Sequence, residues 1–232
     1  MTPQAVAALG RTLVLAPHPD DETIGCGGLL ALLGRAGAAV QVVLFTDGAG
    51  SHRQSREYPR ERLRALRRRE MTEALRELGH GPQGLVTLGL PDGGVPTRGE
   101  PGFDTVVNML ARITRVFRPD TVLMPTRDDA HPDHRATCAA GAAACLRAAP
   151  HARRFEYPVW GANDASRGTW EIDIAAVLDN KRRALASHRS QLGQVVHDDP
   201  LGFILPPDLL ARCTLPVETY FLASAGATDV RQ

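Results

Sequence analysis

The sequence predicts a single α/β domain with a Rossmann-like architecture, in which a mostly parallel sheet carries helices on both faces. Short apolar runs rich in β-branched residues alternate with longer helical segments along the chain. The 232 residues, 43% of them hydrophobic, are enough to bury one sizeable core. No stretch rich in Ser, Gly and Pro is long enough to serve as a linker, so we expect one domain over residues 1–232.

The first unit of this fold is predicted between residues 12 and 46. Residues 12–17 (TLVLAP) and 40–46 (VQVVLFT) are apolar runs typical of strands buried in a parallel sheet. Between them a helix is predicted to begin near Glu22 and to end at Gly34 and Gly37. Strand, helix and strand in this order form a βαβ unit, whose crossover is right-handed in about 98% of cases.

The alternation continues along the rest of the chain. Helices are predicted over residues 61–78, 105–117, 136–148 and 175–188, and strands over residues 85–88, 121–124, 155–160 and 219–223. This order predicts a doubly wound sheet.

The charge balance indicates a small-molecule partner. The formal net charge of +1 gives no electrostatic reason to expect nucleic acid or an acidic membrane surface. Residues 53–69 contain eight arginines, but interspersed glutamates and leucines favour a solvated helix face, from which one arginine can still reach a site. No run approaches the roughly 20 apolar residues that a membrane span needs, so no integral membrane segment is expected. A homo-oligomer is compatible with the sequence.

The cysteines and the N-terminal residues both favour a reduced cytoplasm. The four cysteines show no CxxC spacing, which favours buried free thiols. A basic segment followed by a long apolar run, as in a secretory signal, is not found at the start of the sequence.

Two short strings concentrate metal-binding and proton-transferring side chains: HPDDE at residues 18–22 and HPDH at residues 131–134. Each follows a predicted strand, and ligands of open parallel sheets bind beyond the carboxyl ends of the strands. Asp47 and Asp92 follow two further strands and are expected at the same edge.

The two strings together supply the three protein ligands of a hydrolytic zinc site. His18, Asp21 and His134 are the predicted ligands, since zinc accepts imidazole nitrogen and carboxylate oxygen. Zinc lowers the pKa of its bound water to about 7, so the neighbouring Asp20 is suited to act as general base. His131 is predicted to stabilise an oxyanion as imidazolium, and Asp133 to orient an imidazole.

Each string alone also has a structural interpretation. Acidic residues after a strand favour the start of a helix, and HPDH is compatible with a surface turn that opens one. Their joint occurrence at two strand ends favours a functional site.

At these residues the chain resembles the PIG-L/LmbE-like family of zinc-dependent N-acetylglucosamine deacetylases, whose signatures are PHPDDE and a later HPDH. Residues 17–22 and 131–134 match them letter for letter. Further matches are Gly25 to Gly28, Arg67, Glu70, Ala74, Leu78, Gly79, Leu90 to Gly93, Asp129, Lys181, His188, Ser190 and Gln191.

The resemblance implies the same roles for His18, Asp21, His134, Asp20 and His131. It also implies that Arg67 and Asp92 contact the substrate. Residues 50–60 and 160–170 match no family pattern, and the tryptophans at the ends of the second stretch fit either a lid over a sugar ring or an anchored loop.

We therefore predict a cytoplasmic, metal-dependent amidohydrolase that releases acetate from an N-acetylated amino sugar conjugate. One Zn²⁺ per chain is expected, and Fe²⁺ suits the same donor set. Two alternatives stay open, a non-enzymatic sugar- or nucleotide-binding module and a metal-dependent phosphoesterase with two ions about 3.5–4 Å apart.

Overall fold

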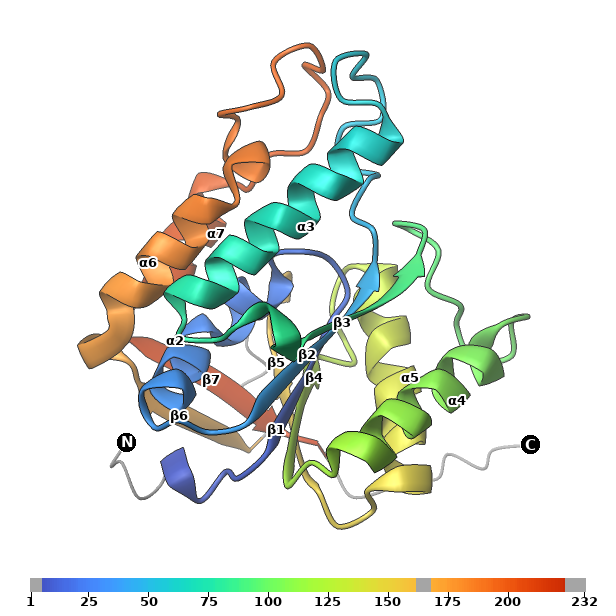
Figure 1. Cartoon of the computed structure of the whole chain (residues 1–232), viewed down its shortest axis with the longest axis vertical. Helices are drawn as coiled ribbons and strands as arrows, with labels where there is room; N and C mark the ends of the chain where they lie inside the picture. Colours follow the sequence, from blue (N-terminus) through green and yellow to red (C-terminus); the bar gives the residue numbers. More distant parts are fainter. Residues whose placement is uncertain (1–5, 162–167, 224–232) are drawn as a thin grey trace.

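A seven-stranded sheet runs through the residues that the computed structural model describes, 6–161 and 168–223 (Figure 1). Its strand order is β3-β2-β1-β4-β5-β7-β6. The strands are β1 (Thr12–Ala16), β2 (Val40–Thr46), β3 (Leu85–Leu90), β4 (Thr121–Pro125), β5 (Arg153–Tyr157), β6 (Thr169–Asp173) and β7 (Val217–Leu222). The strands β1 to β5 pair in parallel, so their carboxyl ends share one edge of the sheet.

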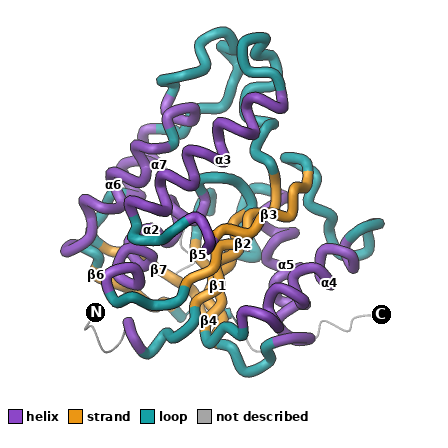
Figure 2. Tube along the Cα trace, in the orientation of Figure 1, coloured by secondary structure: helices purple, strands orange, loops and turns teal. Residues whose placement is uncertain are grey.

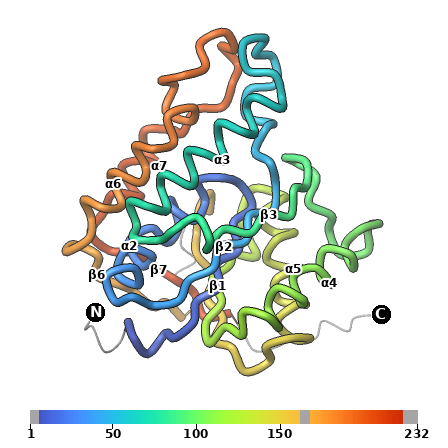
Figure 3. Tube along the Cα trace, viewed as in Figure 1, coloured from blue at the N-terminus to red at the C-terminus, as the bar shows by residue number. Residues whose placement is uncertain are grey.

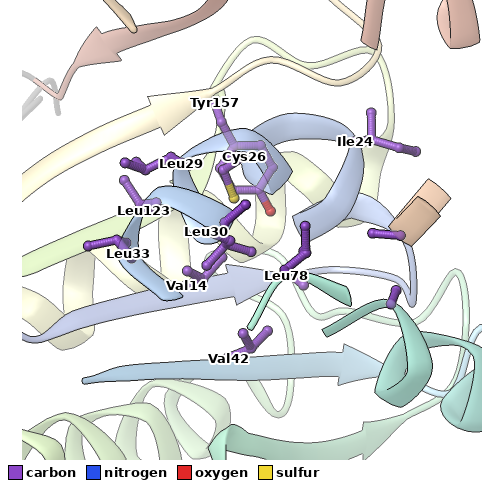
Figure 4. Close-up of a cluster of buried hydrophobic side chains, with 14 of the residues drawn as sticks. Val14, Ile24, Cys26, Leu29, Leu30, Leu33, Val42, Leu78, Leu123 and Tyr157 are labelled. Atoms are coloured by element: carbon purple, nitrogen blue, oxygen red, sulfur yellow. The ribbon is translucent and has the colours of Figure 1, made fainter. Parts of the chain in front are cut away.

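Helices cover both faces of the sheet, as Figure 2 shows in purple and orange. The helices are α2 (Asp21–Arg35), α3 (Arg60–Glu77), α4 (Phe103–Phe117), α5 (Pro132–Ala148), α6 (Leu178–Ser187) and α7 (Pro207–Cys213). On one face α2, α3, α6 and α7 contribute to a core cluster that includes Val14, Leu30 and Tyr157 (Figure 4). On the other face α4 and α5 pack over a second cluster.

The predicted fold class, a Rossmann-like and mostly parallel sheet with helices on both faces, is confirmed. Two elements, β6 and α7, were not predicted from the sequence, and neither was the antiparallel direction of β7 relative to both β5 and β6. The predicted helix over 136–148 begins earlier, at Pro132, which places the second string at the amino end of α5.

Helix α2 bends at Cys26, where φ and ψ leave the helical region. The glycines around the bend allow close packing, as expected. A Cβ on Gly25 would lie 2.1 Å from Cδ2 of Tyr157. The side chain of Glu218 accepts the backbone N–H groups of Gly28 and Leu29 beyond the bend and pairs with Lys181 at 2.7 Å.

All four cysteines are free and buried, as predicted. Within residues 6–161 and 168–223, no helix combines the length and apolar character needed to cross a bilayer.

Candidate metal centre and active site

The three predicted metal ligands meet at the carboxyl edge of the sheet. His18 follows β1, Asp21 begins α2, and His134 lies in the first turn of α5. His18 Nδ1 lies 3.1 Å from Asp21 Oδ2 and 3.3 Å from His134 Nε2. The remaining pair, His134 Nε2 and Asp21 Oδ2, is also 3.3 Å apart. Two ring nitrogens and a carboxylate oxygen thus form a nearly equilateral triangle.

This triangle has the size that a tetrahedral zinc site requires. Ligand bonds of about 2.0–2.1 Å at tetrahedral angles place ligand atoms about 3.3 Å apart. All three residues are buried, and His18 alone of the three shows more than about 2% exposure, at 8%. A divalent cation bound by all three atoms satisfies this donor set, and the residues fit the group that the sequence predicts.

A carboxylate lies beside the outer nitrogen of each imidazole. Asp133 Oδ2 lies 3.1 Å from His18 Nε2, and its carboxylate also accepts the N–H groups of Gly93 and Val95. Asp129 Oδ1 lies 3.4 Å from His134 Nδ1. Such partners fix the tautomer and the ring orientation of metal-binding histidines. The expectation that Asp133 orients an imidazole agrees with this geometry.

The surrounding carboxylates give the cluster an affinity for positive charge. Burial lowers the pKa of both histidines, but the neighbouring aspartates outweigh it. They raise the pKa of His18 well above its usual value and that of His134 to about 9.

Two further groups of side chains have the spacing of metal ligands, His18 with His131 and His134, and His18 with Asp92 and Asp133. The second group uses Nε2 of His18, whereas the triangle uses Nδ1. Ions on opposite nitrogens of one ring, each bound at about 2.0 Å, would lie farther apart than the ~3.5–4 Å of two-metal hydrolases. The arrangement therefore favours a one-metal centre over the phosphoesterase alternative.

Asp20 lies beside the triangle and is held in place from two sides. Its φ of 147° is rare outside glycine, and its carbonyl accepts the N–H groups of Thr23 and Ile24 at the start of α2. Its Oδ2 accepts a 3.0 Å hydrogen bond from Arg67 Nη2. Burial raises the pKa of Asp20 to about 7, although the Arg67 guanidinium lowers it.

His131 caps α5 and also lines the pocket. Its Nδ1 accepts the backbone N–H of Asp133 at 3.1 Å, which leaves Nε2 to carry the proton of the neutral ring. Burial lowers its pKa, and the two nearby histidines add to that effect. The expected imidazolium is therefore disfavoured, and His131 can donate from Nε2 as a neutral imidazole.

Arg67 and Asp92, which were predicted to contact the substrate, are both engaged by the protein. Arg67 is buried and also donates to the carbonyls of Gly48 and Pro19. Asp92 Oδ1 lies 3.3 Å from His18 Nε2, and its Oδ2 accepts the N–H of Gly50. Both still line the pocket, so their contact with substrate stays a prediction.

A pocket of about 240 Å³ opens over Asp20, Asp21 and His131. Its wall includes residues that the sequence analysis did not assign to the site: Ser51, Arg53, Gln191 and Phe203. Trp160 also lines it and meets the Phe203 ring edge to face at 5.7 Å.

The two tryptophans at the ends of residues 160–170 have different surroundings. Trp160 belongs to the pocket wall, whereas Trp170 lies in β6 and packs against Phe155 and Tyr220. Residues 162–167 lie outside the described part of the chain, so the lid stays a prediction.

A family model and two curated relatives agree with the resemblance seen in the sequence motifs. A family model described as PIG-L, GlcNAc-PI de-N-acetylase, matches residues 13–145. The 2'-N-acetylparomamine deacetylase of Streptomyces fradiae is 31% identical over 211 residues, covering 78% of this chain and 74% of the relative. A probable N-acetyl-alpha-D-glucosaminyl L-malate deacetylase 2 of Bacillus cereus is 28% identical over 199 residues, covering 81% and 86%.

Solved structures share the fold. The N,N'-diacetylchitobiose deacetylase from Pyrococcus horikoshii aligns with a TM-score of 0.67 at 25% identity, covering 87% of this chain and 73% of that one. The 4-carboxy-2-hydroxymuconate hydratase GalB from Pseudomonas putida aligns with a TM-score of 0.64 at 17% identity, covering 96% and 99%. That second likeness shows the fold alone, because one fold can host unrelated reactions.

Proposed function

We propose, from the premise that this chain belongs to the PIG-L family, that it is a metal-dependent hydrolase of the acetamide in N-acetylglucosamine-type conjugates. One observation carries the proposal: a ligand triangle of zinc dimensions at the base of a pocket, with Asp20 and His131 beside it. The deacetylase activities named for its relatives support the same reaction. Water and the amide are consumed, and acetate and a free amine are released.

The metal would be held by His18, Asp21 and His134, with one ion per chain. Zn²⁺ suits these donors, and Fe²⁺ is the alternative. Such an ion supplies Lewis-acid polarisation of the amide carbonyl and lowers the pKa of water to about 7.

Asp20 is proposed to take a proton from the attacking water. It lines the pocket next to Asp21, and the Arg67 guanidinium fixes the position of its carboxylate. A base held in this way is already oriented when the substrate arrives.

His131 is proposed to donate from Nε2 to the oxygen of the tetrahedral oxyanion. Its Nδ1 is occupied by the N–H of Asp133, so the ring cannot turn without losing the cap of α5. A fixed donor aimed at developing negative charge stabilises the transition state. Asp20 then returns the proton to the departing nitrogen, which balances the reaction.

The test combines metal analysis with acetate release from a panel of N-acetylglucosamine conjugates. One metal ion per chain and acetate release by the wild type are expected, with a loss of about 100-fold or more in Asp20→Asn. Asp179→Asn, at an exposed position on α6, is the matched control. Full activity of Asp20→Asn would remove that residue from its role.

The same test separates the enzyme from a binding module. A protein that binds the conjugates with one bound metal but releases no acetate, in either form, would contradict the proposed function. A small amino sugar conjugate as partner, and the cytoplasm as location, stay predictions from the sequence.

A further inference from the structure

A second pocket adjoins the one over the metal centre. The first pocket, at about 240 Å³, is smaller than the roughly 300–1,000 Å³ typical of ligand sites. The second has a volume of about 390 Å³ and shares Gly50, Arg53 and Asp92 with the first. A group attached to a sugar ring in the inner pocket therefore has space to extend into this outer pocket.

Arg53 lies at the junction of the two pockets. A Cβ built on Gly93 would lie 3.6 Å from Nη2 of Arg53, which places the guanidinium beside the loop that carries Asp92. Among the described residues, no hydrogen bond or ion pair of Arg53 occurs. Its planar donor groups are free to bind a ligand.

The other charged groups that line the outer pocket are already engaged. Arg60 pairs with Asp47. Asp92 accepts the N–H of Gly50 and lies 3.3 Å from Nε2 of His18. Arg53 thus differs from Arg60 in having no carboxylate partner among the described residues.

The loop that carries Arg53 is held by the segment around residue 200, and Figure 3 shows these two segments side by side. Asp198 accepts the hydroxyl of Ser55 and the N–H groups of Arg56 and Glu57. Asp199 accepts the N–H of Gln54, next to Arg53. Because these bonds already fix the loop backbone, ligand binding would have to order only the Arg53 side chain.

We infer that the outer pocket binds an anionic substituent of the sugar conjugate, a carboxylate or a phosphate group, through the Arg53 guanidinium. This inference rests on the proposed function for the placement of the sugar ring. Arginine matches the paired oxygens of both anions. A neutral substituent would gain no ionic contact, and a cationic one would be repelled.

The test uses N-acetylglucosamine glycosides that differ in charge. The carboxymethyl and 2-phosphoethyl glycosides are compared with the neutral carbamoylmethyl glycoside. Their affinity is measured by calorimetry with the full-length, metal-loaded Asp20→Asn protein, which should not consume them appreciably during the titration, and the loop variants are made in the same background. Because Arg53 is exposed, both anions are expected to bind about three- to fivefold more tightly than the amide. The preference should weaken at high salt.

Variants of the loop then assign the preference to one side chain. Arg53→Gln should reduce the anion-to-amide ratio to about one, whereas Arg56→Gln should retain it. Arg56 is exposed in the same loop but lines neither pocket. Tighter binding of only one anion would identify which group the pocket takes.

Acetate release by the wild type, measured in parallel, separates this inference from the proposed function. Equal affinities for all three glycosides, no binding, or a preference that persists in Arg53→Gln would overturn the anion site even if acetate is released. An Arg53-dependent preference without acetate release would keep the site and reject the deacetylase.

Discussion

Arg67 links three segments of the chain at the active site. Its guanidinium donates to the carbonyls of Pro19 and Gly48 and to the carboxylate of Asp20. These acceptors lie in different directions, so the contact depends on the forked geometry of arginine. The residue therefore acts on Asp20 directly, whether or not it also contacts the substrate.

Arg67→Lys should preserve the positive charge but lose the fork. We expect kcat to fall by about 100-fold, because a misplaced general base is costly, while the far-UV circular dichroism spectrum stays unchanged. Acetate release measures the effect, and Arg68→Lys, at an exposed position of the same helix, is the control. Wild-type turnover in Arg67→Lys would show that Asp20 needs no such support.

We expect Asp133 to support the proposed metal centre in a comparable way. Asp133→Asn should weaken metal binding by about 10- to 100-fold, because the amide no longer offers a charged acceptor to the ring of His18. Competition with a chromogenic chelator measures the affinity. Asp104→Asn, on an exposed part of α4, should bind metal like the wild type.

The candidate ligands and one of their partners, Asp133, could be predicted at the level of single residues, but the other partner could not. Metal chemistry selects His18, Asp21 and His134 from the two strings, and the structure brings them together. The carboxylate opposite His134, Asp129, and the ionisation state of His131 depend on contacts in three dimensions. No spacing in the sequence encodes those contacts.

At the scale of elements, the bend in α2 separates the residue that begins the helix at the site from a second part held by a buried ion pair. Asp21 lies before the bend, and the N–H groups of Gly28 and Leu29 lie after it. Glu218 on β7 accepts both, and Lys181 on α6 compensates its charge. The pair is buried, so each charge depends on the other.

Removing one partner of this pair should destabilise the protein strongly. Lys181→Met should lower the free energy of unfolding by about 3–5 kcal/mol, because it leaves the Glu218 carboxylate buried without its countercharge. The double variant Lys181→Met/Glu218→Gln should recover part of that loss. Urea denaturation of the wild type, the Lys181→Met and Glu218→Gln single variants and the double variant measures the coupling, and purely additive losses would contradict it.

The elements that the sequence did not predict are those with the weakest local signals. β6 has five residues and, among the described strands, pairs with β7 alone, so its place in the sheet depends on a partner distant in the sequence. α7 has seven residues, too few for a helical period to be recognised. The longer amphipathic and β-branched segments were predicted because local pattern and tertiary packing agree there.

For the whole molecule, the buried His188 links stability to pH. It lies 3.4 Å from the hydroxyl of Thr23 and 4.0 Å from the carboxylate of Glu22, where α2 meets the end of α6. Burial lowers its pKa to about 3, and the Arg67 charge adds to this effect. Below pH 6.5 the unfolded chain therefore binds a proton that the native protein does not.

The native protein should therefore lose stability as the pH falls. As pH falls from about 6 to 4, His188 should reduce the free energy of unfolding by about 1.4 kcal/mol per pH unit. His188→Gln should reduce that slope by the same amount in urea titrations at several pH values. The exposed His151→Gln is the control for loss of an imidazole. Parallel curves for wild type and His188→Gln would contradict the prediction.

The ligand triangle, Asp20 and His131 all lie within residues 13–145, whereas Trp160, Gln191 and Phe203 line the pocket from later in the chain. Under the proposed function, reactivity and part of the recognition surface are thus encoded in separate stretches of one polypeptide. Replacing the later stretch with that of a relative should change the range of substrates while the proposed catalytic residues stay the same. Substrate specificity can therefore diverge in this architecture without a change of reaction.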